Sequence, residues 1–180
     1  FGVMDITRPI APDPYNLLPP CQSFTLTSTE NREGEPLPFL HAADGANLSP
    51  QLSWEDFPAE TQSFLVSCFD PDAPTPAGYW HWTVLDIPPT LTSLEQGAGS
   101  SDALLPHPAA HVPNDAREAR FMGAAPPLGD RPHRYIFAVH ALDVPTLGLE
   151  AATITPTTAA FNAVFHTLAR ACLTATYQRH

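Results

Sequence analysis

Two aspartates and a histidine stand close together in the segment FDPDAPTPAGYWHW, residues 69–82. Asp70 and Asp72 follow an apolar run, His81 lies at the start of the next one, and three prolines fall in the connection. A turn needs only one Asp and one Pro, so the segment carries more polar and rigid residues than its turn requires. His133 has a similar position, directly before another apolar run and after the proline-rich stretch APPLGDRP. If these runs are neighbouring strands, the polar side chains converge at one end of a sheet.

Three kinds of chemistry suit such a group. Histidine and aspartate could bind Zn²⁺, but no helical or CxxC ligand pair with the usual short spacing occurs, so we expect no metal. Asp70 with His81 or His133 could act as general acid and base, although no GxSxG motif supplies a nucleophile. Imidazolium groups and loop N–H groups could instead hold a phosphate-like anion. Residue types alone also allow a purely structural role, with aspartates capping turns and a packed histidine.

The composition limits the choice of partners. The 180 residues carry a net charge of −11, and all eight basic residues are arginine. A phosphate backbone would be repelled, so we expect no nucleic acid partner, and no basic patch favours an anionic membrane surface. The length predicts one domain over residues 1–180.

Targeting signals and cysteines bear on the compartment. No apolar stretch of about 18 residues and no signal-like start is present in this sequence, so we expect no membrane span. The three cysteines, Cys21, Cys68 and Cys172, are widely spaced and form no CxxC motif. They are interpreted as buried thiols in a reducing compartment, which predicts a cytoplasmic protein.

The apolar patterns predict a mostly β fold with an antiparallel-rich sheet. Because proline is confined to strand edges, turns and the starts of elements, the 22 prolines indicate short strands joined by irregular loops. Residues 90–128, rich in Gly, Ala, Pro and Ser, are expected to form a long loop with some extended structure. Strands are expected at Ser23–Ser28, Gln51–Trp54, Ser63–Phe69, Trp80–Ile87 and Tyr135–Leu142.

A single helix is expected, over residues 155–177. Thr155 is a candidate N-cap and Pro156 suits the first turn. The apolar residues that follow recur at helical spacing and should pack against the sheet as core. They are Phe161, Val164, Phe165, Leu168 and Cys172.

Two long segments carry a family resemblance. DPDAPTPAGYWHW and APPLGDRPHRYIFAVHAL resemble the two signature regions of the phosphatidylethanolamine-binding protein family, the group that includes the Raf kinase inhibitor protein. The bacterial and archaeal members are the most similar. GANLSPQLSWEDFP, the PND at residues 113–115 and the C-terminal helix add to the resemblance, which runs from about residue 24 to residue 177.

The resemblance implies a large central β-sheet packed against a smaller one, with a C-terminal helix. It also implies a pocket for small phosphate-type anions, including phospholipid head groups. We expect no cofactor. The expected role is binding, as an inhibitor or regulator of a kinase or protease, and a homodimer is compatible with it. The alternative is a hydrolase or other acid/base enzyme that uses Asp70 with His81 or His133. Transferred position by position, the pocket consists of Asp70, Asp72, Ala73, Pro74, Trp80, His81, Gly123, Pro126, Pro127, His133 and Tyr135.

This sequence departs from the family pattern after the Asn-Asp pair. The family commonly has a glycine and aromatic residues there, whereas this chain reads DAREARFMGAAPP. Arg117 and Arg120 could lie on the rim of the pocket or in a solvated loop. Arg134 is expected to pair with an acidic residue rather than with a ligand, and His140 to lie in the core or on the sheet surface.

Overall fold

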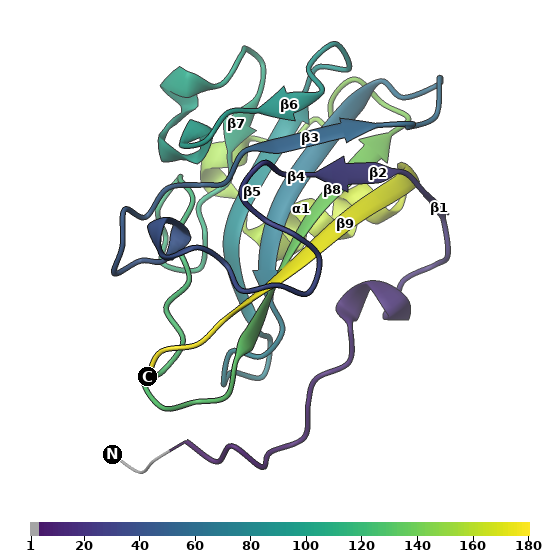
Figure 1. Cartoon of the computed structure of the whole chain (residues 1–180). Helices are drawn as coiled ribbons and strands as arrows, with labels where there is room; N and C mark the ends of the chain where they lie inside the picture. Colours follow the sequence, from purple (N-terminus) through teal and green to yellow (C-terminus); the bar gives the residue numbers. More distant parts are fainter. Residues whose placement is uncertain (1–3) are drawn as a thin grey trace.

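The computed structural model describes residues 4–180, which form two β-sheets and one α-helix (Figure 1). The larger sheet has the strand order β1-β9-β8-β4-β5-β7, and the smaller sheet has the order β2-β3-β6. Neighbouring strands are antiparallel, except that β1 runs parallel to β9. The strands are β1 Gln22–Ser23, β2 Thr25–Thr27, β3 Leu52–Glu55, β4 Ser63–Asp70, β5 Tyr79–Ile87, β6 Ser93–Leu94, β7 Ala110–His111, β8 His133–Leu142 and β9 Thr167–Tyr177.

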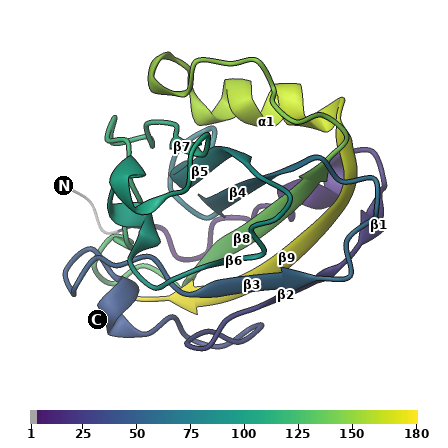
Figure 2. The same ribbon diagram turned by 90° about the horizontal axis from the view of Figure 1, so that it is seen from above.

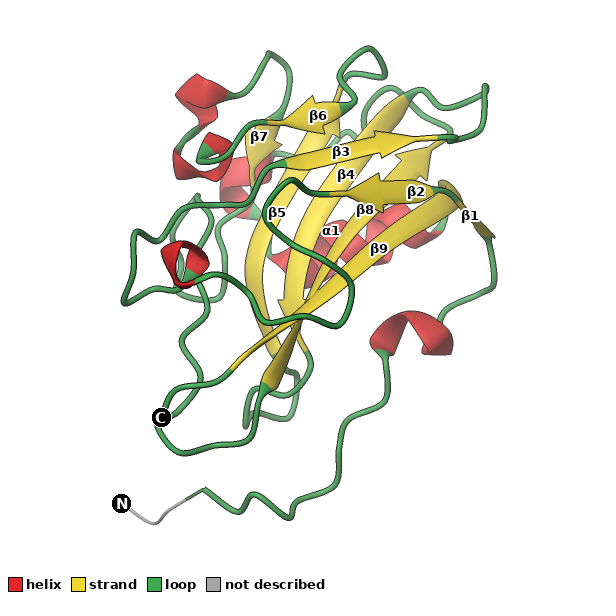
Figure 3. Cartoon of the chain, viewed as in Figure 1, coloured by secondary structure: helices red, strands yellow, loops and turns green. Residues whose placement is uncertain are grey.

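Helical structure is short and lies outside the two sheets (Figure 3). Helix α1, Pro156–Val164, is the only α-helix in residues 4–180. Its cap is as expected, because the Thr155 hydroxyl accepts a hydrogen bond from the Thr158 N–H at 3.1 Å. The 3₁₀ helices are η1 Pro14–Leu17, η2 Phe39–His41, η3 Ala98–Ser100, η4 Asp102–Leu104 and η5 Ala151–Thr153.

The larger sheet is covered on both faces, which explains the nearly continuous apolar runs of β4 and β8. Side chains such as Phe64 and Phe137 pack toward the smaller sheet and form the main core. On the other face, which α1 covers (Figure 2), Leu65 and Leu142 form a second buried cluster with Ala159 and Ala163 of that helix. Burial of each such side chain contributes about 1.5–3 kcal/mol to the free energy of folding.

A β-bulge in β5 sorts the three residues Trp80, His81 and Trp82 between the two faces. Cys68 pairs with Trp82, but the next residue, Phe69, pairs with Trp80, so His81 is the extra residue. His81 and Trp82 therefore both lie on the face toward the smaller sheet, where Trp82 belongs to the main core. Trp80 lies on the opposite face and contacts Phe69, with ring centroids 4.6 Å apart.

The expected strands are confirmed for the centre of the fold and altered at its edge. β4, β5 and β8 match the predicted ranges within two residues at each end, and β3 is shifted by one residue. The predicted strand Ser23–Ser28 is two short strands in different sheets, β1 and β2. The loop at residues 90–128 contains the short strands β6 and β7, as expected for a mainly irregular segment.

The prediction of one helix through residue 177 is wrong beyond Val164. Residues 167–177 form β9, which lies between β1 and β8 in the larger sheet. The expected apolar stripe is not core either, because Phe161 and Phe165 are 66% and 69% exposed. The side of α1 that is buried carries the small residues Ala159 and Ala163.

The cysteine prediction is correct only for Cys68, which is buried; Cys21 and Cys172 are exposed, and all three thiols are free. Within residues 4–180, no helix has the length and apolar character needed to cross a membrane. The cytoplasmic location stays a prediction.

Candidate functional site

A cavity of about 210 Å³ opens where the end of β4 meets the beginnings of β5 and β8. Because β4 is antiparallel to both neighbours, its last residue lies beside their first residues. The cavity lies on the face of the sheet that packs toward the smaller sheet. Its lining consists of Asp70, Ala73, Pro74, Thr75, Tyr79, His81, Met122, Ala125, Pro126, Pro127, His133 and Tyr135.

Asp70 organises the turn that forms one wall of the cavity. Its Oδ1 accepts hydrogen bonds from the backbone N–H groups of Asp72 at 2.8 Å and Ala73 at 3.0 Å. Its Oδ2 lies 2.8 Å from Nδ1 of His133. Both carboxylate oxygens are therefore committed to the protein, and the prolines around them limit the conformations of the loop.

His133 is held between two carboxylates. Besides its bond to Asp70, its Nε2 lies 2.8 Å from Oδ2 of Asp130. Arg8 from the N-terminal segment donates to both oxygens of Asp130, at 2.8 and 2.7 Å. The result is a chain of four side chains, Asp70, His133, Asp130 and Arg8. In it the imidazole is 1% exposed and the two carboxylates 3% and 0%.

This chain fixes the protonation of its members. A carboxylate only accepts, so a ring with a carboxylate at each nitrogen must donate from both, which requires the imidazolium form. Burial alone lowers the pKa of His133, but the bonds to Asp70 and Asp130 outweigh it, and the net pKa is raised. The Arg8 guanidinium, together with His133, holds the pKa of Asp130 well below its ordinary value.

His81 is the second histidine of the cavity and has the opposite character. Its Nδ1 lies 2.8 Å from the carbonyl oxygen of Met122, which can only accept, so Nδ1 carries the proton. Its ring contacts Tyr135 edge to face, with ring centroids 5.2 Å apart. Burial lowers the pKa of His81. The neutral ring therefore has an unprotonated Nε2, and no hydrogen bond to that atom is formed by the described residues.

Tyr135 adds a second polar group without a partner. Its hydroxyl is buried and makes no hydrogen bond among residues 4–180. Burial, followed by the nearby Asp70, raises the pKa of Tyr135, so the hydroxyl stays a neutral donor. An unsatisfied buried hydroxyl costs about 1–3 kcal/mol, which a ligand atom in the cavity would relieve.

Eight of the eleven pocket residues taken from the resemblance line this cavity, and three lie elsewhere. Asp72 turns away from the cavity and pairs with Arg134, whose Nη2 lies 2.8 Å from its Oδ1; the expectation that Arg134 has an acidic partner is confirmed. Trp80 lies on the opposite face of the sheet. Gly123 approaches the backbone of the η2 region, where a Cβ atom would lie 2.4 Å from the carbonyl oxygen of His41. The eight that line the cavity are Asp70, Ala73, Pro74, His81, Pro126, Pro127, His133 and Tyr135.

Sequence reasoning missed several members of the site. Thr75, Tyr79, Met122 and Ala125 also line the cavity. Asp130 lies three residues before His133, and that spacing in the stretch GDRPH was the available signal. No pattern near the N-terminus indicates that Arg8 would reach this region.

The Asn-Asp segment supports β5 rather than the cavity. Asp115 accepts a hydrogen bond from the backbone N–H of Trp80 at 2.8 Å, and Asn114 holds its own loop through its side-chain amide. Arg117 is exposed, and neither Arg117 nor Arg120 contributes to the cavity lining. In residues 4–180, no group of three or more His, Cys, Asp or Glu side chains is arranged to hold a metal ion.

Comparison with known proteins places the chain in a family. The family model described as phosphatidylethanolamine-binding protein matches residues 27–178. This protein belongs to the phosphatidylethanolamine-binding protein family. YbhB of Escherichia coli, a UPF0098 protein, is 42% identical over 157 residues, which cover 84% of this chain and 98% of YbhB.

Solved structures of the family show the same fold. The crystal structure of E. coli YbcL, described as a new member of the mammalian PEBP family, superposes with a TM-score of 0.84 and 38% identity. CT736 of Chlamydia trachomatis, described as a homologue of the family, has a TM-score of 0.76 and 31% identity. Each comparison covers 88% of this chain and 99% of the other. The predicted combination of a large sheet, a smaller sheet and a C-terminal helix is therefore confirmed.

Proposed function

We propose that this protein binds small phosphate-type anions, either free or as the head group or phosphorylated side chain of a larger molecule. The observation that carries the proposal is the pair of unpartnered polar groups, Nε2 of His81 and the hydroxyl of Tyr135, at one cavity beside the cationic His133. A protonated His81 and the Tyr135 hydroxyl would each donate to a phosphate oxygen.

The charges around the cavity are compatible with an anion. Three carboxylates lie in or behind the wall, on Asp70, Asp72 and Asp130. Two guanidinium groups, on Arg8 and Arg134, and the imidazolium of His133 balance them in full. The net charge of these six side chains is zero, so they do not repel an incoming anion as a group. The proton that His81 takes up offsets part of the negative charge that the anion brings.

Binding is favoured over hydrolysis by the way these groups are used. Asp70 already accepts hydrogen bonds from His133 and from two backbone N–H groups, and both ring nitrogens of His133 donate to carboxylates, so the imidazolium has no lone pair with which to take a proton from a nucleophile. The hydroxyl of Thr75, on the cavity wall, donates to the carbonyl oxygen of Gly78. A role as inhibitor or regulator of a kinase or protease would follow if the bound anion were a phosphorylated residue of the partner.

The test measures binding of inorganic phosphate and of glycerophosphoethanolamine by calorimetry. His81→Ala should weaken both at least about tenfold, the loss expected for a charge-assisted hydrogen bond. His166→Ala is the matched control, because that histidine pairs with Asp143 near the C-terminal end of α1, outside the cavity.

The pH dependence of anion affinity has a predicted direction. Burial lowers the pKa of His81 in the free protein, and a bound anion raises it, so binding takes up a proton above the lowered value. Affinity should then fall as the pH rises from below about 6.5 toward 8. The phosphodiester group of glycerophosphoethanolamine keeps a constant charge over this range, whereas inorganic phosphate itself ionises near pH ~6. The pH dependence of glycerophosphoethanolamine binding therefore reports the protonation of the histidine alone.

An affinity for glycerophosphoethanolamine that is independent of pH, or an affinity of His81→Ala equal to that of the parent, would exclude His81 from the site. Repeated turnover of a phosphate ester would favour the hydrolase.

A further inference from the structure

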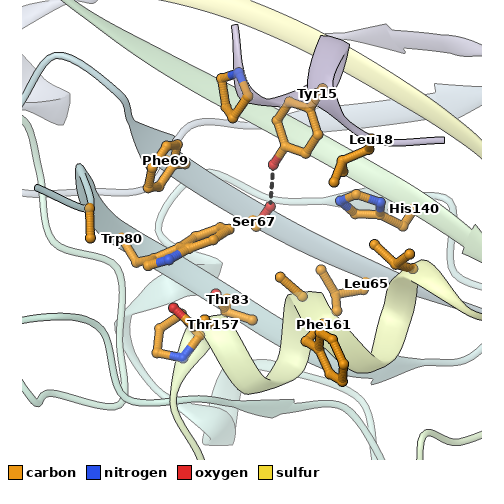
Figure 4. Close-up of a pocket in the computed structure, with 15 residues that line it drawn as sticks. Tyr15, Leu18, Leu65, Ser67, Phe69, Trp80, Thr83, His140, Thr157 and Phe161 are labelled. Carbon is orange, nitrogen blue, oxygen red and sulfur yellow. Dashed lines mark hydrogen bonds between the residues drawn. The ribbon is translucent and has the colours of Figure 1, made fainter. Parts of the chain in front are cut away.

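A second cavity, of about 480 Å³, lies on the opposite face of the larger sheet (Figure 4). Strands β4, β5 and β8 form its floor, α1 forms one wall, and the N-terminal segment around η1 forms the other. Its lining shares no residue with the cavity around His81. Ligand pockets in proteins commonly have volumes of about 300–1,000 Å³, so this cavity is large enough for a small molecule.

The walls favour an uncharged occupant. No Asp, Glu, Lys or Arg contributes to the lining. Phe69 and Trp80 pack against each other on the floor, and Phe161 stands at the edge, where its ring is 66% exposed. A charged ligand would lose its hydration here without gaining an opposite charge, while an apolar ligand would gain by leaving water.

Polar side-chain atoms in the lining are few, and those of Tyr15, Ser67 and Thr83 have weak hydrogen bonds or none. The Tyr15 and Ser67 hydroxyl oxygens are 3.4 Å apart, longer than an ordinary O–H···O hydrogen bond. The hydroxyl of Thr83 is buried and makes no hydrogen bond among residues 4–180.

His140 provides a donor of defined orientation. Its Nδ1 accepts a hydrogen bond from Nε of Arg170 at 3.3 Å, and since a guanidinium can only donate, the ring proton must be on Nε2. Burial, together with Arg170, lowers the pKa of His140 to about 3, so the ring stays neutral. The structure gives no hydrogen-bond acceptor to this N–H among the described residues, although His140 is only 7% exposed and lines the cavity.

We propose that this cavity binds an uncharged, largely apolar small molecule with a carbonyl, ester or ether oxygen that accepts a hydrogen bond from His140. The floor residues Leu65, Ser67 and Thr83 are all buried. An occupant must therefore enter between α1 and η1, which suits a narrow molecule better than the surface of a folded protein. The site is independent of the anion site, since it uses other residues on the other face of the sheet.

The test uses the neutral naphthalene ketone prodan, whose fluorescence shifts to shorter wavelength in apolar surroundings. We expect saturable binding of one probe per chain and energy transfer from tryptophan to the probe. Trp80 lines the cavity, whereas Trp54 and Trp82 lie in the main core, so Trp80→Phe should reduce that transfer without removing the blue shift.

Two substitutions on the helix wall locate the probe. Ala160→Trp fills the cavity and should weaken binding at least about tenfold. Phe161→Ala should weaken it less, and Phe165→Ala is its matched control. Both rings are similarly exposed and contact each other, but only Phe161 lines the cavity.

The proposed hydrogen bond from His140 to the ketone oxygen is tested by comparing two probes. A probe without the ketone, 2-dimethylaminonaphthalene, should bind the parent about tenfold more weakly than prodan does, whereas His140→Phe should bind the two probes with similar affinity.

Non-saturable binding of prodan, or equal affinities of the parent, Ala160→Trp and Phe161→Ala for prodan, would overturn the proposal. Self-association that Ala160→Trp abolishes, without saturable prodan binding to the parent, would assign the cavity to a second copy of the chain and would also overturn it. His81→Ala should leave prodan binding unchanged, so failure here and failure of the anion site are distinguishable.

Discussion

The two histidines of the family signatures differ in protonation because their partners differ. His133 bonds two carboxylates and is held as a cation, whereas His81 bonds a carbonyl and is neutral at rest. The sequence predicts that both belong to one site, but it treats them as equivalent ligands of the anion. Asp130 makes the difference, and its role depends on Arg8, which is more than 120 residues away in the sequence.

Loss of the His133 cation should strongly destabilise the protein. His133→Leu leaves the buried carboxylates of Asp70 and Asp130 without the charge between them, and breaking a buried pair in this way costs about 3–5 kcal/mol. Urea denaturation below pH 6 measures the effect. His166→Leu is the control, since its ion pair with Asp143 is 40% and 47% exposed and should contribute less than about 1 kcal/mol.

The pH dependence of that loss has a definite sign. The folded pKa of His133 is raised above the unfolded value of about 6.5. Its stabilising contribution is therefore complete below the unfolded pKa and is lost as the pH rises through the raised folded pKa. The difference between parent and His133→Leu should shrink over that range. A difference that grows with pH would contradict the imidazolium assignment.

At the scale of the elements, the long strands could be predicted because their apolar runs are strong. Ser63–Phe69, Trp80–Ile87 and Tyr135–Leu142 are rich in β-branched, aromatic and other large apolar side chains, which favour strands. The bulge that sorts the tryptophans could not be predicted, because it depends on register against β4. The polar site residues that were found, Asp70, His81 and His133, lie at the ends of these strands, and most of those that were missed lie in loops or in the N-terminal segment, Tyr79 at the start of β5 being the exception.

The last strand shows why the end of the predicted helix was wrong. In β9 the residues that face the main core are mostly alanines, at 169, 171 and 175, with Leu173. Alanine has the highest helix propensity, and its small side chain makes the two-residue alternation weak. Tertiary packing overrides the local preference, because large side chains from β8 and the smaller sheet leave room only for small ones.

Adjacent substitutions in β9 should therefore have unequal effects. Ala171→Leu places extra volume in a packed core and should cost about 1–3 kcal/mol or more. Cys172→Leu changes the same strand on its exposed face and should alter stability by less than about 0.5 kcal/mol. Chemical denaturation of both variants checks this difference, and equal costs would contradict the assignment of faces.

At the scale of the whole molecule, the N-terminal segment joins the two sites on opposite faces of the larger sheet. Arg8 bonds Asp130 behind the anion cavity, and Tyr15 forms part of the wall of the apolar cavity. Between them, Arg134 donates to the carbonyl oxygen of Ala11 at 2.7 Å, and Arg131 donates to that of Pro9 at 3.1 Å. The segment is thus held by side chains of the second signature region.

Loss of Arg8 should loosen this segment and weaken the anion site together. Arg8→Gln removes one positive charge from the balanced group, so an anion near His133 would meet a net negative charge. We expect phosphate affinity to fall about fivefold, the lower end of the usual range for coupling between two sites, and hydrogen exchange to rise at the backbone amides of residues 5–13. Arg117→Gln is the matched control, because it makes the same change in net charge at an exposed position outside both cavities. Calorimetry and exchange mass spectrometry at one ionic strength compare the two variants. Equal losses of affinity would mean that only overall charge matters, and faster exchange without weaker binding would mean that Arg8 fastens the segment but does not influence the cavity.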